Sequence, residues 1–116
     1  MKQSRRENAR WIVLRILEAG RPIGASETVV SRILADIRMR YSVEELRTEL
    51  IYLHKLGLID IDRRDRETWT ALQGLGLIDV DQQYVETWWV KLTAHGIRVV
   101  EYSTAAPAGI GRPRGD

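Results

Sequence analysis

Arginine side chains gather in one short stretch of the sequence, where RRDR occupies residues 63–66. A guanidinium group keeps its positive charge at all ordinary pH values, and its planar fork of N–H donors matches phosphate oxygens. Three such groups at a turn favour contact with a polyanion, although charged turns are also common on solvated surfaces. The candidate phosphate contacts of this stretch are Arg63, Arg64 and Arg66.

Two further groups of basic residues stand near the ends of the chain, whose formal net charge is +2. Residues 1–21 contain six basic and two acidic side chains, including Arg5, Arg6 and Arg10, and the last five residues contain two more arginines. Separated basic patches attract a phosphate backbone more strongly than the net charge alone suggests. The distribution therefore favours double-stranded DNA as a partner.

Paired aspartates occur twice, within residues 60–62 and 79–81, and such pairs can hold a metal ion or transfer protons. The residues that follow them do not continue a calcium-binding loop, because Arg64 and Tyr84 stand where an oxygen ligand and a glycine are needed. The chain also has no cysteine and only two histidines. We therefore expect no enzyme activity, cofactor, metal ion or small-molecule substrate.

One short unit occurs twice in the sequence. Residues 53–69 read LHKLGLIDIDRRDRETW and residues 72–88 read LQGLGLIDVDQQYVETW, so ten of seventeen aligned positions are identical. This identity indicates a tandem duplication, with repeats at 53–71 and 72–90. The repeats differ most in their loops, where the second has QQYV in place of RRDR.

Helical spacing of apolar residues, together with capping signals, predicts four helices. Ser4 with Glu7 and Ser42 with Glu45 form capping boxes, and Gly57 stands where a helix ends. The predicted helices cover residues 5–19, 27–39 (capped by Ser26), 43–56 and 94–102 (capped by Thr93). The second is expected to carry one apolar face composed of Val29, Val30, Ile33, Leu34 and Ile37.

Beyond Gly57 the apolar residues alternate instead, which predicts strands. The expected strands are Leu58–Asp62, Glu67–Leu72, Leu77–Asp81 and Glu86–Leu92, so each repeat reads as a β-hairpin. Either the four strands form a meander in sequence order, or the outer two pair with each other and the inner two project. The short link at residues 73–76 favours the meander.

The order of three helices and a hairpin resembles a winged helix-turn-helix domain, on the residues LRTELIYLHKLGLIDID and WWVKLTAHG. More narrowly, RRENARWIVLRILEAGRPIGASE and LTAHGIRVVEYSTAAPAGIGRP resemble the small winged-helix proteins of Mu-like phages and prophages. The resemblance implies an α+β fold over residues 1–102, with an enlarged wing of up to four strands and a short C-terminal helix. Residues 103–116 are expected to form an extended or mobile tail.

The tryptophans of the repeats suggest a second kind of surface. Trp69 and Trp88 are equivalent and are expected to pack their hairpins onto the protein. Trp89 alternates with Trp88 and should face the other way, near Tyr84 and Val85. These three residues form a candidate apolar interface for a partner such as a second copy of the chain.

The third helix is the candidate recognition element, yet Glu44 and Glu45 at its start would be repelled by phosphates, and only Arg47 is basic in its first two turns. Two hypotheses therefore stay open. The first is a phage-encoded winged-helix DNA-binding protein, a transcriptional regulator, in the cytoplasm of a bacterial host. The second is a winged-helix module for protein–protein interaction or oligomerisation without DNA. No apolar run is long enough to cross a membrane.

Overall fold

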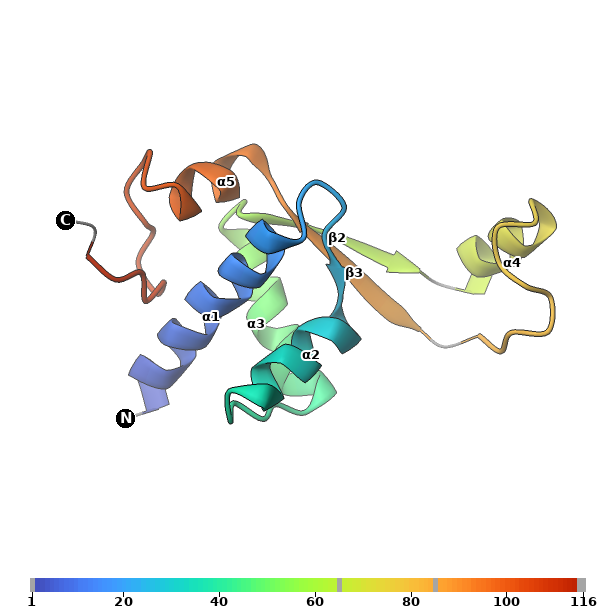
Figure 1. Cartoon of the computed structure of the whole chain (residues 1–116), viewed down its shortest axis with the longest axis horizontal. Helices are drawn as coiled ribbons and strands as arrows, with labels where there is room; N and C mark the ends of the chain where they lie inside the picture. The colour runs from blue at the N-terminus through green and yellow to red at the C-terminus, as the bar shows by residue number, and fades with distance from the viewer. Residues whose placement is uncertain (1, 65, 85, 115–116) are drawn as a thin grey trace.

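The computed structural model describes residues 2–64, 66–84 and 86–114, without the side chains of residues 2, 3 and 64. This part of the chain forms an α+β structure of five helices and one three-stranded antiparallel sheet (Figure 1). The elements in chain order are α1 (Lys2–Ala19), β1 (Ala25–Ser26), α2 (Glu27–Asp36), α3 (Val43–Lys55), β2 (Ile59–Arg64), α4 (Arg66–Gly74), β3 (Thr87–Leu92) and α5 (Ala94–Val100).

Helices α1, α2, α3 and α5 pack around one hydrophobic core with the base of the sheet (Figure 1). Successive side chains of a strand point to opposite faces, so Trp88, Val90 and Leu92 of β3 enter this core while Lys91 faces outward. The side chains at its centre are almost fully buried and include Leu14, Leu17, Leu34, Leu50, Leu53, Leu58, Val90 and Val99.

The capping signals locate the starts of three helices. The Ser26 hydroxyl accepts the Val29 N–H at 3.2 Å at the start of α2, and Thr93 caps α5. Both hydrogen bonds of the capping box between Ser42 and Glu45 are present at α3. The box predicted at Ser4 is wrong, because α1 already begins at Lys2 and Ser4 lies inside its first turn. Lysine and glutamine are good helix formers, so the helix extends over residues 2 and 3.

Helix α2 buries a narrower face than its apolar residues predicted. Val30 and Leu34 are buried, whereas Val29, Ile33 and Ile37 are 43%, 37% and 49% exposed. The exposed three are spaced by four residues and so lie on one side of the helix, next to the buried line. The body of the protein therefore contacts only part of the apolar face of α2.

The predicted four-stranded wing is not formed. Strand β2 pairs with β3 in antiparallel register, Ile61 opposite Val90 and Asp62 opposite Trp89. The two-residue strand β1, which the sequence patterns did not reveal, pairs with the other edge of β3, so the sheet order is β1-β3-β2. Both edges of β3 are thereby occupied, and residues 77–81 form no strand. The meander is therefore wrong, and the outer strands of the two repeats pair with each other.

The duplicated unit encodes a helix end rather than a hairpin. Gly57 after α3 and Gly76 after α4 have almost the same left-handed backbone, with φ of 75° and 77°. The Leu58 N–H donates to the carbonyl of Leu53 at 3.1 Å, and the equivalent bond from Leu77 to Leu72 measures 3.0 Å. These are the hydrogen bonds of a Schellman cap, in which glycine takes the left-handed position. The second repeat thus repeats the end of α3, and the strand predicted at Glu67–Leu72 is a helix.

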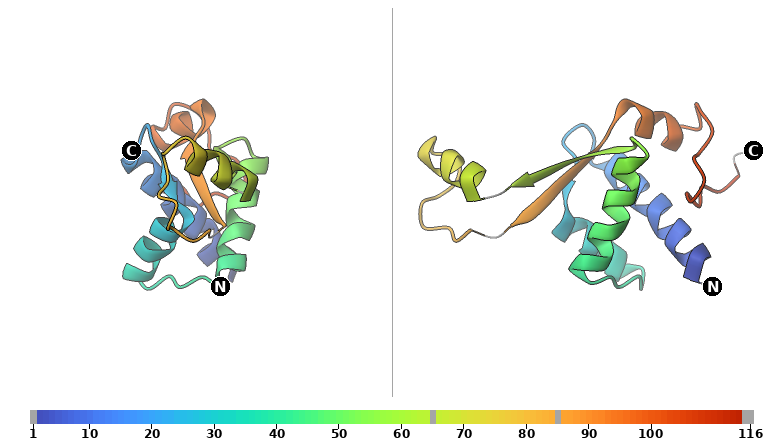
Figure 2. Two further views of the ribbon diagram at one scale, coloured as in Figure 1. Left: turned by 90° about the vertical axis from the view of Figure 1, so that its right-hand side faces the viewer. Right: turned by 180° about the vertical axis from the view of Figure 1, so that it is seen from behind.

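The chain between β2 and β3 forms an arm that extends beyond the ends of these two strands (Figures 1 and 2). We use the term arm for residues 66–84, which contain α4 and the turns that follow it. Among the described residues, the arm is the part that stands apart from the body in Figure 1 and in the right-hand view of Figure 2. The principal extents of the molecule are accordingly unequal, at 50 × 28 × 22 Å.

The C-terminal residues 103–114 contain no helix or strand and return along the body (Figure 1). The Gly111 N–H donates to the Glu7 carbonyl at 2.9 Å, and Arg112 donates to the Val99 carbonyl at 2.9 Å. Ile110 packs against the core cluster. These contacts bind the described residues of the tail to α1 and α5.

Candidate functional site

Two of the basic residues of α1, Arg6 and Arg10, share one carboxylate of the protein, that of Glu49. Arg10 is only 3% exposed, and its Nε donates to Glu49 Oε1 at 2.7 Å. Its guanidinium also donates to the Gly109 carbonyl and lies 3.8 Å from the centre of the Tyr52 ring. Arg6 donates to the second oxygen of Glu49 at 2.8 Å, and this hydrogen bond raises the pKa of the Arg6 guanidinium. Arg10 therefore cannot reach a phosphate, and we remove it from the predicted DNA contacts.

Arg47 joins three elements at the base of the arm. Its Nε donates to Glu27 Oε2 at 2.8 Å, a bond that raises the pKa of the guanidinium. Glu27 is itself buried and accepts the backbone N–H of Trp88 at 3.2 Å. The guanidinium groups of Arg47 and Arg63 lie 4.6 and 4.5 Å from the Trp88 ring. This cluster holds α2, α3 and β3 together. Two of the predicted DNA contacts, Arg47 and Arg63, therefore make contacts within the protein.

The RRDR stretch is not the tip of a hairpin. Arg63 and Arg64 belong to β2, and Arg66 is the first residue of α4. The Arg66 guanidinium lies 4.7 Å from the centre of the Tyr84 ring. The side chain of Arg64 lies outside the described residues. These arginines are consequently not presented together on a tight turn, as the prediction required.

The predicted aromatic interface is divided between two parts of the molecule. Trp89 belongs to β3, and its indole N–H donates to the Ile23 carbonyl at 2.8 Å. Tyr84 lies in the arm and packs edge-to-face on Trp69, with ring centres 5.7 Å apart. Val85 lies outside the described residues. Trp69 and Tyr84 stabilise the arm from inside, and this packing does not include Trp89.

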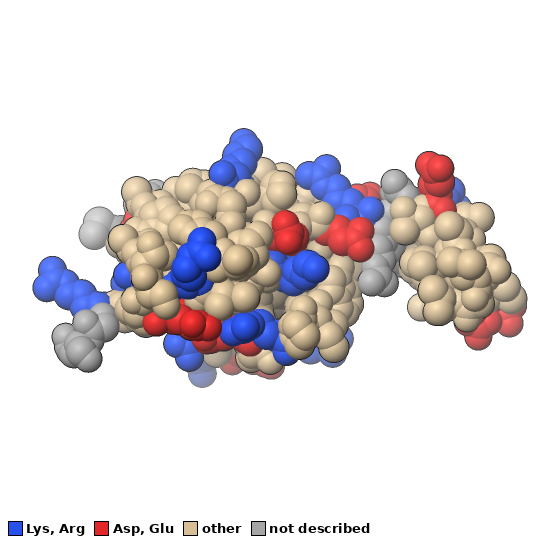
Figure 3. Space-filling view, turned by 90° about the horizontal axis from the view of Figure 1, so that it is seen from above, with Lys and Arg blue, Asp and Glu red and all other residues tan. Residues whose placement is uncertain are grey.

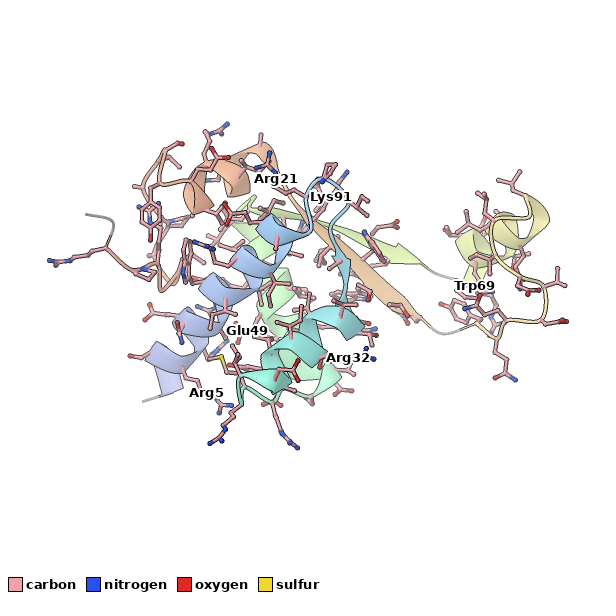
Figure 4. All side chains as sticks on the ribbon, in the orientation of Figure 1. Arg5, Arg21, Arg32, Glu49, Trp69 and Lys91 are labelled. Atoms are coloured by element: carbon pink, nitrogen blue, oxygen red, sulfur yellow. The ribbon has the colours of Figure 1, made fainter. Side chains whose placement is uncertain are left out.

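An exposed basic surface, which the sequence patterns did not single out, lies around α2 and the turn that follows it. Arg32, Arg38 and Arg40 are exposed, and none makes an ion pair with another described residue. Arg5 approaches the same turn, with its guanidinium 5.4 Å from the Tyr41 ring, and Figure 4 shows Arg5 and Arg32 on the lower side of the body. The phrase RMR at residues 38–40 was the available signal.

The end of the arm exposes large aliphatic side chains. Leu75, Leu77 and Val80 are 74%, 71% and 76% exposed, and we refer to these three residues as the arm tip. In the first repeat the equivalent residues are Leu56, Leu58 and Ile61, which pack in or against the core. The arm tip is therefore a copy of core-forming residues placed where the described chain offers them no core. Clustered exposure of this kind is typical of an interaction surface.

The arm is acidic as well as apolar. Residues 66–84 include one basic side chain, Arg66, and three acidic ones, Glu67, Asp79 and Asp81. Acidic side chains are visible on the arm in the space-filling view of Figure 3. Apolar residues surrounded by charge of one sign resemble the core and rim of a protein interface. The same negative charge would repel a nucleic acid backbone.

No protein-family model matches the chain, and comparisons with curated proteins and with solved structures found no similar protein. The described residues contain no helix long and apolar enough to cross a membrane. They also contain no group of three or more histidine, aspartate or glutamate side chains arranged to hold a metal ion.

Proposed function

We propose that this chain is a winged-helix protein that acts through protein–protein contact, with the arm as its contact element. The winged-helix assignment is supported by the element order α1-β1-α2-α3-β2-α4-β3, in which α4 is an insertion between two wing strands, and by the sheet order β1-β3-β2. In this assignment α2 and α3 are the helix-turn-helix pair, and β2 and β3 are the wing. The inserted residues between β2 and β3 enlarge the wing into an arm.

The observation that carries the proposal is the arm tip. Three aliphatic side chains within six residues of the chain, Leu75, Leu77 and Val80, are each more than 70% exposed. They belong to the arm, which projects from the body in Figure 1. Burying them against a partner would be favourable, at about 25 cal/mol per Å² of apolar surface removed from water. The arginines predicted to hold DNA support this choice indirectly, because Arg6, Arg10 and Arg47 are bound to carboxylates of the protein itself.

Site-specific photo-crosslinking tests the proposal directly. The chain has no cysteine, so Leu75→Cys gives a single site for a benzophenone label at the arm tip. Arg98→Cys places the same label on an exposed position of α5 as the matched control. We expect protein adducts from the arm-tip label, in the purified protein or in a bacterial extract, that the control label does not give. If neither setting gives an adduct specific to the arm tip, the arm is not a contact element.

DNA binding is the second candidate function, and the exposed arginines of the α2–α3 turn favour it. If Arg38 and Arg40 each neutralise one phosphate, replacing both by serine should reduce the slope of log affinity against log salt by about 2 units. The measurement is duplex DNA binding at several salt concentrations. An unchanged slope, or no DNA binding by the wild-type chain, would remove this candidate.

A further inference from the structure

The chain exposes a second apolar surface that, like the arm tip, consists of aliphatic side chains. Val29 and Ile33 of α2 and Ile37 at its C-cap are between 37% and 49% exposed, and we call these three residues the α2 stripe. The spacing of four residues makes them neighbours on the helix surface. A partner that brings aliphatic side chains could bury this stripe in the way that the core buries Val30 and Leu34.

The two apolar surfaces differ in the sign of the charge around them. Residues 28–40, which contain the α2 stripe, carry three basic side chains and one acidic side chain. The arm carries one basic and three acidic side chains. Complementary charge steers two surfaces together and disfavours contact between two copies of the same surface. The arm tip therefore suits the α2 stripe better than it suits another arm tip.

The other surfaces of a second copy to which the arm tip could bind are less suitable. The place that Leu58 and Ile59 fill in the core is already occupied by the first repeat of every chain. If residues 77–81 were added to the outer edge of β2 with their apolar side chains on the same face as those of β2, Asp79 and Asp81 would share the other face with Asp60 and Asp62. Like charges on neighbouring strands disfavour such pairing.

We propose that the arm tip of one copy docks on the α2 stripe of a second copy, with Asp79 and Asp81 near Arg38 and Arg40. The arm points away from the body in Figures 1 and 2, so it meets this surface on another molecule rather than on its own. Two copies that exchange arms in this way form each contact twice and close as a dimer. The inference rests on the proposed function, since it names the partner of the arm.

The apolar part of the contact is tested by sedimentation of the purified protein over a range of concentrations. The wild-type chain should associate, and the double variant Leu77→Ser/Val80→Ser should do so about tenfold more weakly or not at all. Ile23→Ser is the matched control, because Ile23 is 70% exposed but lies outside both surfaces. Equal loss of association in the control, or a monomeric wild type at every concentration, overturns the proposal.

Charge reversal identifies which two surfaces meet. One variant carries Asp79→Arg and Asp81→Arg, and the other carries Arg38→Asp and Arg40→Asp. In each variant by itself, the arm and the surroundings of the α2 stripe carry charge of the same sign, so each variant should stay monomeric. In an equimolar mixture, the arm of either variant meets an α2 stripe of opposite charge on the other variant, so heterodimers should form. Raising the salt concentration should weaken these heterodimers.

A mixture that associates no more than its separate components overturns the pairing of arm with α2 stripe. The crosslinking result then decides how far the failure extends. If the Leu75 label still captures another protein from the extract, the arm remains a contact element and only the self-docking is lost. If it captures nothing, both proposals fail together.

Discussion

At the scale of single residues, the arginines are the group whose roles depend most on distant partners. Arg10 is separated from Glu49 by 39 positions and is buried with it, whereas Arg38 and Arg40 lie in a turn and stay exposed. A cluster of basic residues in a sequence therefore contains two populations. One holds the protein together, and the other is available to a partner.

The contact between Glu27 and Arg47 allows a direct measurement of the first role. Replacing Glu27 by alanine should lower the free energy of unfolding by about 3 kcal/mol, because it leaves a partly buried guanidinium and the Trp88 N–H without their acceptor. Arg32→Ala on the exposed side of α2 is the control, with an expected change below about 0.5 kcal/mol. Urea unfolding followed by tryptophan fluorescence measures both, and equal losses would show that the cluster does not stabilise the fold.

At the scale of elements, the two repeats show how one sequence can take part in two structures. Both repeats form a helix end with a left-handed glycine, since this cap needs only hydrogen bonds between residues close in the chain. Only the first continues as a strand. Pairing requires a free edge on β3, and there the second repeat finds β1 and β2 already in place.

This distinction accounts for what the sequence could and could not predict. The starts of α2, α3 and α5 were predictable because Ser26, Ser42 and Thr93 each bond within three residues of themselves. The absence of a strand at residues 77–81 was not predictable, because their alternating pattern is the same as that of residues 58–62, of which residues 59–62 do form a strand. The burial of Arg10 and the exposure of the arm tip are likewise set by contacts, or missing contacts, with distant parts of the chain.

Removing one repeat tests whether the two are interchangeable. Deleting residues 58–76 joins Gly57 to Leu77, so that Leu77, Ile78 and Val80 follow α3 in place of Leu58, Ile59 and Ile61. We expect the shortened chain to keep the fold with a free energy of unfolding within about 1.5 kcal/mol of wild type, the cost of an isoleucine-to-valine change in a core. Circular dichroism and urea unfolding provide the measurement. A shortened chain that does not fold would show that the second repeat cannot replace the first.

At the scale of the whole molecule, the arm changes the shape more than the mass. The radius of gyration is 15.3 Å, whereas a compact chain of this length is expected to have about 13.4 Å. The shortened chain without residues 58–76 should return to about 12.5 Å. Small-angle X-ray scattering at low concentration measures both values. Equal radii for the two proteins would mean that the arm folds back on the body in solution.

The edge of β3 that β2 occupies can pair with only one strand, and this affects how the chain folds. Residues 78–83, the equivalents of β2 in the second repeat, lie nearer to β3 along the chain, since only residues 84–86 would separate them from Thr87, against residues 65–86 for β2. The shorter loop closes at an entropic advantage of about 1.8 kcal/mol, from the logarithmic dependence of closure entropy on length. We therefore expect residues of the second repeat to pair with β3 before β2 does. The native register then forms by exchange, as β2 takes the edge because it alone is continuous with α3 and with the buried Leu58 that follows α3.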